Sequence, residues 1–130
     1  MEMDPELLEL DRIGRIVVDS AFRVHKALGP GLLESVYEAC LFHELTKRGL
    51  RVRKQVDLPI RYDDLLLESG LRLDLLVEEM VIVELKAVER LTPVFEAQLL
   101  SHLKLAEKRL GYLINFNVAL IKDGIKRMMV

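Results

Sequence analysis

Two charged residues interrupt the most apolar stretch of the sequence. Glu84 and Lys86 lie in the run Val81–Val88, which is otherwise apolar and rich in β-branched side chains. Such a run is typical of a central β-strand covered on both faces. Residues two positions apart in a strand share one face, and burying charges is unfavourable unless they are paired or hold a ligand. A structural ion pair is the simplest interpretation, and a functional site is the alternative.

A third charged residue, Asp74, lies in a preceding apolar strand predicted over Leu71–Val77. If residues 78–80 form a three-residue loop, the register places Asp74 directly opposite Glu84. Two carboxylates at such a pair lie about 5 Å apart at Cβ, where like charges destabilise a sheet. A divalent cation relieves this repulsion, and Mg²⁺ takes one or two carboxylates, carbonyls and several waters. A register shift of two residues keeps the shared face but loses the direct opposition.

The same register places Arg72 opposite Lys86, so two acids and two bases would share one face. Such a site has the parts for phosphodiester hydrolysis: a metal polarises a phosphoryl oxygen and lowers the pKa of a bound water. Lys86 can orient that water and stabilise developing negative charge. The sequence contains no recognisable nucleophile turn and no Gly-rich phosphate loop, because Gly29-Pro30-Gly31 lacks the lysine and the preceding strand.

Two helices are predicted ahead of these strands. Apolar residues recur at helical spacing over residues 7–28, Pro5 suits the first turn, and the Gly-Pro-Gly of residues 29–31 ends the helix. A second helix is predicted over residues 33–48, ended by Gly49. Its expected buried positions are Val36, Tyr37, Cys40, Leu41 and Leu45.

The rest of the chain is predicted to consist of strands, in which apolar residues recur every two positions, and one further helix. A strand is predicted over 52–60, and residues 62–68 are its predicted hairpin partner, with the turn at Asp63-Asp64. Further strands are predicted over 71–77 and over 81–88. Thr92-Pro93 predicts the N-terminus of a helix that reaches about residue 108. A strand over 111–116, parallel to 81–88, and a short strand over 125–130 complete a mixed central sheet flanked by helices. We expect one α/β (α+β) domain over residues 1–130.

Composition limits the classes of function. The 130 residues are 51% apolar, enough for a packed core, yet no uninterrupted apolar run exceeds four residues, so no membrane partner is expected. The acidic start lacks the features of a secretory signal. Cys40 is the only cysteine, which excludes an internal disulfide and favours a reducing, cytoplasmic location. The net charge of −2 gives no argument for nucleic acid, although carboxylates of a metal site count as plain negative charge.

The residues resemble a known family. Gly31-Leu-Leu-Glu34-Ser-Val-Tyr37 matches the motif for which the GxxExxY protein family is named, and Asp74 with Glu84-x-Lys86 is similar to the signature of the PD-(D/E)XK nuclease superfamily. Further similar stretches lie over 71–77, 83–89 and 113–117, so the resemblance covers nearly the whole chain from Ile13. It implies a restriction-endonuclease-like α-β-β-β-α-β core with an extra N-terminal helix.

The resemblance also implies roles for individual residues. Asp74 and Glu84 would be metal ligands for Mg²⁺ or Mn²⁺, with the Leu85 carbonyl as a third, Glu34 as an assisting acid and Lys86 as the catalytic lysine. Gln98 matches a glutamine found on the following helix in many such nucleases, where an aromatic residue often comes four positions later. Here that position is His102, which is either a phosphate contact or a partly buried helix-edge residue. Tyr37 is either a substrate-positioning residue or a packed tyrosine with a bonded hydroxyl.

The sequence therefore predicts a metal-dependent nuclease domain with nucleic acid, and DNA in particular, as its partner. The alternative is a non-catalytic module of the same fold that binds nucleic acid or protein, because a fold and a signature are not a reaction. A homodimer or larger assembly would supply a second site and a wider groove. Basic residues over 47–54 or 104–109 could contact a nucleic-acid backbone if they lie beside the acidic site.

Overall fold

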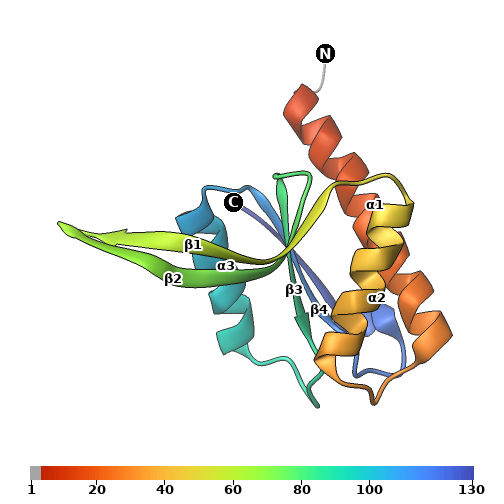
Figure 1. Cartoon of the computed structure of the whole chain (residues 1–130). Helices are drawn as coiled ribbons and strands as arrows, with labels where there is room; N and C mark the ends of the chain where they lie inside the picture. The colour runs from red at the N-terminus through yellow and green to blue at the C-terminus, as the bar shows by residue number, and fades with distance from the viewer. Residues whose placement is uncertain (1–3) are drawn as a thin grey trace.

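The structure is a computed structural model that describes residues 4–130, and it forms one five-stranded sheet with helices on both faces (Figure 1). The sheet order is β1-β2-β3-β4-β5, in which only the β3–β4 pair is parallel. This confirms the predicted mixed sheet, its element order and the parallel crossover. The elements are α1 (Pro5–Leu28), α2 (Glu34–Lys47), β1 (Val52–Tyr62), β2 (Leu65–Val77), β3 (Val81–Lys86), α3 (Pro93–Ala106), β4 (Leu110–Asn115), the 3-10 helix η1 (Ile121–Gly124) and β5 (Ile125–Met129).

The core has two halves, one on each face of the sheet. Helices α1 and α2 pack on one face around Val17, Leu41 and the odd-numbered residues of β3, whereas α3 packs on the other around Leu99 and Leu103. Figure 1 shows α1 and α2 on one side of the sheet and α3 on the other. Because β3 alternates between these halves, its residues 82, 84 and 86 point towards α3.

Local signals explain where the first two helices begin and end. The Asp4 side chain accepts a hydrogen bond from the Glu6 backbone N–H, and Pro5 occupies the first turn of α1. Gly29 and Gly31 have φ angles of 72° and 96°, a region that residues with a Cβ rarely adopt, so the chain turns there before α2 begins at Glu34.

Several predicted boundaries differ from the structure. Residues 65–77 form one continuous strand, not the two predicted over 62–68 and 71–77, because β1 pairs with β2 on both sides of Gly70. Strand β3 ends at Lys86 and α3 ends at Ala106, each two residues earlier than predicted. The Thr92 side chain makes no capping hydrogen bond, although Thr92 occupies the N-cap position.

The buried face of α2 also differs in one residue. Val36 was predicted to be buried, but it is 36% exposed. Tyr37, Leu41 and Leu45 recur every four residues and set the buried line, and Val36 lies about 100° away from Tyr37 around the helix. Cys40 is half-buried at the margin of the core.

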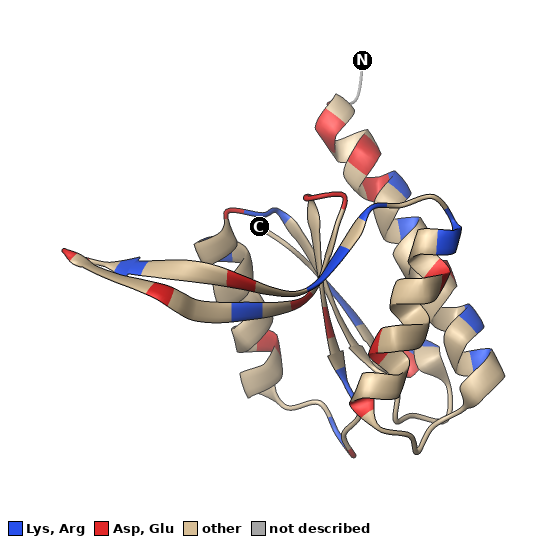
Figure 2. Cartoon of the chain, in the orientation of Figure 1, with Lys and Arg blue, Asp and Glu red and all other residues tan. Residues whose placement is uncertain are grey.

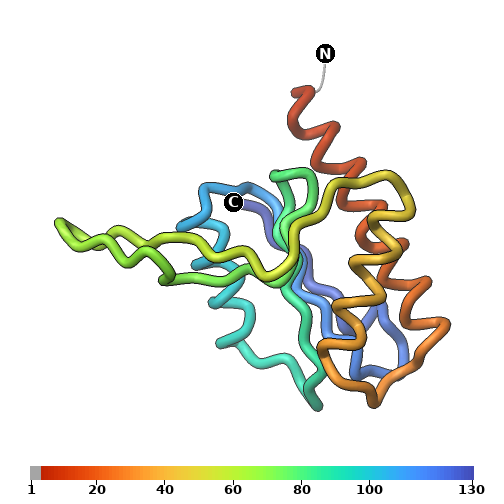
Figure 3. Tube along the Cα trace, in the orientation of Figure 1, coloured from red at the N-terminus to blue at the C-terminus, as the bar shows by residue number. Residues whose placement is uncertain are grey.

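The outer parts of β1 and β2, residues 58–71, extend as a two-stranded arm that stands clear of the rest of the molecule (Figure 3). The predicted turn at Asp63-Asp64 forms the tip of this arm. Figure 2 shows acidic residues at the tip and both signs of charge along the two strands. Within residues 4–130, none of the helices is both long and apolar enough to span a lipid bilayer.

Candidate active site

The candidate site lies where β2 and β3 separate. Their ladder runs from Val77↔Val81 to Leu75↔Val83 and then stops, so the predicted register is confirmed and Asp74 and Glu84 are the next residues on the two strands. Beyond this point the Asp74 Oδ2 atom accepts a hydrogen bond of 2.8 Å from the Leu85 backbone N–H. The Asp74 backbone N–H points to Glu84 Oε2 at 3.4 Å. The Asp74 carboxylate therefore takes the place of the next backbone acceptor of the ladder, at the point where the two carboxylates meet.

Arg72 does not join this site, contrary to the predicted pairing with Lys86. The β2–β3 ladder ends before either residue is reached, and the Arg72 Nε atom instead lies 3.0 Å from Asp57 Oδ1 on β1. The physical reason is the separation of the two strands, which leaves Arg72 on a part of β2 that pairs only with β1.

Glu84 is buried against α3. Its side chain is 9% exposed, and its Oε1 atom lies 2.7 Å from the Nδ1 atom of His102. Burial raises the pKa of Glu84 to about 7, the hydrogen bond with His102 opposes that increase, and the negative charge of Asp74 adds to it. Burial therefore makes the ionised form of Glu84 less favourable than that of an exposed glutamate, and a nearby cation would favour it.

Lys86 is not the ion-pair partner of Glu84. Among residues 4–130, no carboxylate lies within ion-pair distance of its ammonium group. The Nζ atom instead lies 4.6 Å from the centroid of the Phe95 ring, which gives a cation–π contact. The backbone carbonyl of Lys86 accepts a hydrogen bond from the Phe116 N–H, which fixes the strand to the β4 side. The structural ion pair that the sequence left open is therefore absent, and the ammonium group stays available.

Two glutamates of α2 approach from the opposite face of the sheet. Burial raises the pKa of Glu34, the charge of Asp74 raises it further, and the charge of Lys86 lowers it. Burial and the charge of Asp74 also raise the pKa of Glu38, whose hydrogen bond of 2.7 Å from Gln55 acts in the opposite direction. Glu38 was missed by the sequence reasoning, although its position four residues after Glu34 puts both carboxylates on one helix face.

Tyr37 is buried, and its hydroxyl is used inside the chain. It donates a hydrogen bond of 2.6 Å to the Gly29 carbonyl and accepts one of 3.1 Å from the Leu32 N–H. Its ring stacks on that of Phe116, with centroids 4.7 Å apart. These contacts favour the packing interpretation of Tyr37 over contact with a substrate.

Two asparagines at the end of β4 and just beyond it, Asn115 and Asn117, hold segments beside the site, and the sequence reasoning missed both. Asn117 Oδ1 accepts a hydrogen bond of 3.0 Å from the Gly31 N–H. The buried Asn115 side chain pairs with both backbone groups of Val88, at 3.1 and 2.9 Å. These amides hold the loop before α2 and the chain after β3, so they help to place Glu34 and Lys86. The sequence signal that could have identified them was an asparagine at the end of an otherwise apolar strand.

Gln98 and His102 lie on one face of α3 and line a notch of about 510 Å³ between α3 and the arm. Gln98 is exposed, whereas His102 is half-buried and contacts Glu84. Only His102 therefore reaches the carboxylates directly. Both side chains border the open side of the site.

The basic residues over 47–54 are mostly paired. Arg51 and Arg53 form ion pairs with Glu78 and Glu79 of the β2–β3 turn, at 3.5 and 2.7 Å. Arg48 pairs with Asp19 and Glu44. These side chains brace the fold and do not form a free basic track beside the acids.

The donor set suits a hard divalent cation. Successive peptide groups of a strand alternate between its neighbours, so the Leu85 N–H and carbonyl both face Asp74, on the side opposite the Lys86–Phe116 bond. Within residues 4–130, no three His, Cys, Asp or Glu side chains form a ready-made metal cluster. Two carboxylates and one carbonyl nevertheless fit Mg²⁺ or Mn²⁺, which complete their shells with water.

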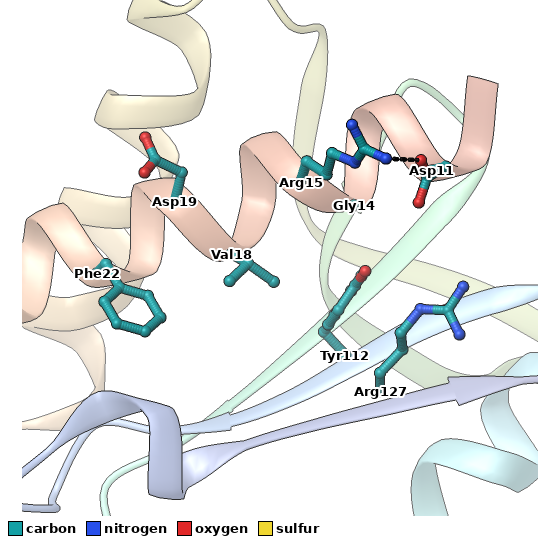
Figure 4. A pocket seen from close by; sticks show the side chains of 8 residues that line it. All are labelled: Asp11, Gly14, Arg15, Val18, Asp19, Phe22, Tyr112 and Arg127. Carbon is teal, nitrogen blue, oxygen red and sulfur yellow. Dashed lines mark ion pairs between the residues drawn. The ribbon is translucent and has the colours of Figure 1, made fainter. Parts of the chain in front are cut away.

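A second hollow lies elsewhere, between α1 and strands β4 and β5 (Figure 4). Its lining includes the Asp11–Arg15 ion pair of 2.8 Å, drawn as a dashed line in Figure 4, together with Val18, Phe22 and Tyr112. The acids that line it are paired with arginines, Asp11 with Arg15 and Asp19 with Arg48. This hollow therefore lacks the adjacent carboxylates that meet at the β2–β3 site.

A mixed sheet that carries Asp on one strand and Glu-x-Lys on the next, with an acid from the preceding helix, is the restriction-endonuclease-like arrangement. The sequence model of the PD-(D/E)XK nuclease superfamily matches residues 11–128. The chain belongs to this superfamily, and the predicted fold class is confirmed. No curated protein and no solved structure matches the chain.

Proposed function

We propose that this protein is a metal-dependent nuclease that hydrolyses phosphodiester bonds in nucleic acid, with DNA as its substrate and Mg²⁺ or Mn²⁺ as its cofactor. The superfamily supports the reaction class. The observation that carries the proposal is the meeting of Asp74 and Glu84 where the β2–β3 ladder stops, with the Leu85 backbone beside them. Burial first, and then the charge of Asp74, raises the pKa of Glu34, Glu38 and Glu84. A cluster of carboxylates that repel one another beside an unpaired lysine is suited to a cation and a phosphate.

In this proposal Asp74, Glu84 and the Leu85 carbonyl hold the ion, and Glu34 assists from α2. The bound ion would polarise a phosphoryl oxygen and lower the pKa of a coordinated water. Lys86, held over Phe95 at 4.6 Å, would orient the attacking water and stabilise the charge that develops on the phosphate. His102 would keep the Glu84 side chain oriented through their 2.7 Å contact.

The test is cleavage of single- and double-stranded DNA and RNA with Mg²⁺ or Mn²⁺, comparing the wild type with Asp74→Asn and Lys86→Ala. Matched controls are Asp57→Asn on β1 and Lys26→Ala on α1, which make the same changes at exposed positions away from the site. We expect loss of cleavage in the first two variants only. Activity that survives both site substitutions would contradict these roles.

A second candidate is a non-catalytic module that binds nucleic acid or protein with the same fold. It is favoured by one contact: Glu84 already has a partner in His102 at 2.7 Å and needs no ion to be satisfied. Calorimetric titration with Mn²⁺ separates the two functions, since a module of this kind keeps its fold and binds no metal. Cytoplasmic location, which the single Cys40 favours, is part of both proposals.

A further inference from the structure

Gln55 has an unusual backbone conformation for a residue inside a strand. Its φ angle is 52°, in the left-handed region that favours glycine. Among residues 4–130, four other residues with a Cβ have a positive φ, and all of them lie in turns or at the end of a helix: Asp63, Glu78, Glu79 and Glu107. Only Gln55 therefore combines a side chain, a left-handed backbone and a place within a strand in this part of the chain.

This conformation occurs directly beside the candidate site. Gln55 faces Asp74 across β1 and β2, because the residues before and after Gln55 pair with the residues after and before Asp74. On the other side of Asp74, the β2–β3 ladder stops. The backbone is therefore irregular on both sides of Asp74. Strained backbone of this kind costs free energy and persists where the surrounding structure requires it.

The fold explains the backbone of Gln55 but not its side chain. Val52 packs with the core half that α1 and α2 cover, whereas Val56 packs with the half that α3 covers, although alternate residues of a regular strand share one face. The same reversal occurs on β2 between Leu73 and Leu75. A left-handed residue at position 55 accompanies this reversal, and glycine would adopt that conformation without strain.

The Gln55 side chain supplies a contact that glycine could not make. Its Nε2 atom donates a hydrogen bond of 2.7 Å to the Oε2 atom of Glu38, which is half-buried on α2. Burial raises the pKa of Glu38, the hydrogen bond from Gln55 lowers it, and the charge of Asp74 raises it. The carboxylates of Glu38 and Asp74 therefore interact, and Gln55 contacts one of them while its backbone lies opposite the other.

The chemistry of an amide suits this contact. A lysine or arginine could also hold Glu38, but it would neutralise the charge of the carboxylate. The amide of glutamine is a neutral donor, so it fixes the orientation of Glu38 and leaves the negative charge available. Holding a glutamate side chain in one orientation costs side-chain entropy, and the hydrogen bond from Gln55 offsets that cost.

We propose that Gln55 is a positioning residue of the candidate active site, whose left-handed backbone directs its amide to Glu38 and holds that carboxylate near Asp74. This role rests on the proposed nuclease function, in which Glu38 would add its negative charge to the acids that attract the divalent ion. Loss of a group that orients the surroundings of a metal site commonly lowers metal affinity by about 10- to 100-fold. The chain thus accepts a strained strand residue in order to place one carboxylate.

A comparison of Gln55→Gly with Gln55→Ala in the full chain separates backbone strain from the amide. Both variants lose the hydrogen bond to Glu38, but only glycine accepts a φ of 52° without strain. Gln55→Gly is therefore expected to unfold at a higher urea concentration than Gln55→Ala. Both variants are expected to weaken Mn²⁺ binding, measured by calorimetry, by about tenfold. Asp63→Gly is the matched control, because it relieves a φ of 54° at the tip of the arm and should leave the Mn²⁺ affinity unchanged.

A double variant tests whether Gln55 acts through Glu38. Glu38→Gln should weaken Mn²⁺ binding by a similar factor, and adding Gln55→Gly should cause no further loss. Wild-type Mn²⁺ affinity in Gln55→Gly, or additive losses in the double variant, overturns the proposal. A wild-type protein that binds no Mn²⁺ overturns the proposed nuclease function instead. Carbon-13 NMR of the metal-free protein then tests the positioning by itself, because the pKa of Glu38 should rise in Gln55→Gly, and an unchanged titration of Glu38 overturns the proposal.

Discussion

Glu84 provides the sharpest test of the site, because its burial makes an ionised carboxylate unfavourable in the metal-free protein. Burial raises its pKa from 4.5 to about 7. Between these values the unfolded chain is ionised while the folded chain keeps the proton. A folded-state pKa above the unfolded value contributes stability that is present at low pH and lost as pH rises through the folded pKa. At 1.36 kcal/mol per unit, the loss is about 3 kcal/mol.

We therefore predict that metal-free wild type loses stability between pH 5 and pH 8, and that Glu84→Gln removes most of this loss. The amide keeps the size of the side chain and a hydrogen bond to His102, but it cannot ionise. The measurement is the free energy of unfolding from urea denaturation at several pH values in the presence of a chelator. The difference between the two curves reports the titration of Glu84 together with its coupling to His102 and Asp74, because both chains share the remaining titrating groups.

At pH 8 divalent ions should reverse the relative stability of the two proteins, so that the wild type becomes more stable than Glu84→Gln. Ions that bind only the folded state stabilise it by about 2.7 kcal/mol at 100 times their dissociation constant, and the wild type should gain more from Mn²⁺ than the variant. Glu68→Gln on the exposed arm controls for the loss of one negative charge. Parallel pH curves for the wild type and Glu84→Gln would refute the reasoning, because they would mean that Glu84 ionises equally easily in both states.

Two further predictions concern the lysine and the tyrosine. Lys86→Met should keep the contact with Phe95 but lower the cleavage rate by about 100-fold or more. The Mn²⁺ affinity measured by calorimetry should not fall. An equal loss of cleavage rate and Mn²⁺ affinity would assign Lys86 to metal binding. Tyr37→Phe should keep the stacking on Phe116 and lose both hydroxyl hydrogen bonds, which lowers the free energy of unfolding by about 1–3 kcal/mol. Hydrogen exchange should then accelerate at Leu32, and unchanged protection there would contradict the role of the hydroxyl.

Much of the fold follows from local patterns. The alternation of Leu71–Val77 and Val81–Lys86, joined by a three-residue loop, was sufficient to predict the register Val77↔Val81. A strand, a helix and another strand required a parallel crossover, which β3 and β4 form. These predictions succeed because side-chain alternation and short connections leave few alternatives.

The arm shows where a local pattern is insufficient. Leu65, Leu66 and Leu67 look like buried strand residues in the sequence, yet all three are exposed. Whether an apolar strand residue is buried depends on whether a helix reaches it, and α3 ends before it covers the tip. The predicted break near Gly70 is a register shift within one strand, since the pairing passes from Leu58↔Leu71 to Ile60↔Leu67 while β2 continues.

For the site, the sequence by itself determined that Asp74, Glu84 and Lys86 would lie together, because one register and one alternation bring them there. The tertiary structure alone decided their partners. It placed His102 against Glu84, Glu38 near Asp74, and Phe95 under Lys86. These contacts depend on the offset and rotation with which α2 and α3 pack on the sheet, and side-chain packing between distant segments sets both quantities.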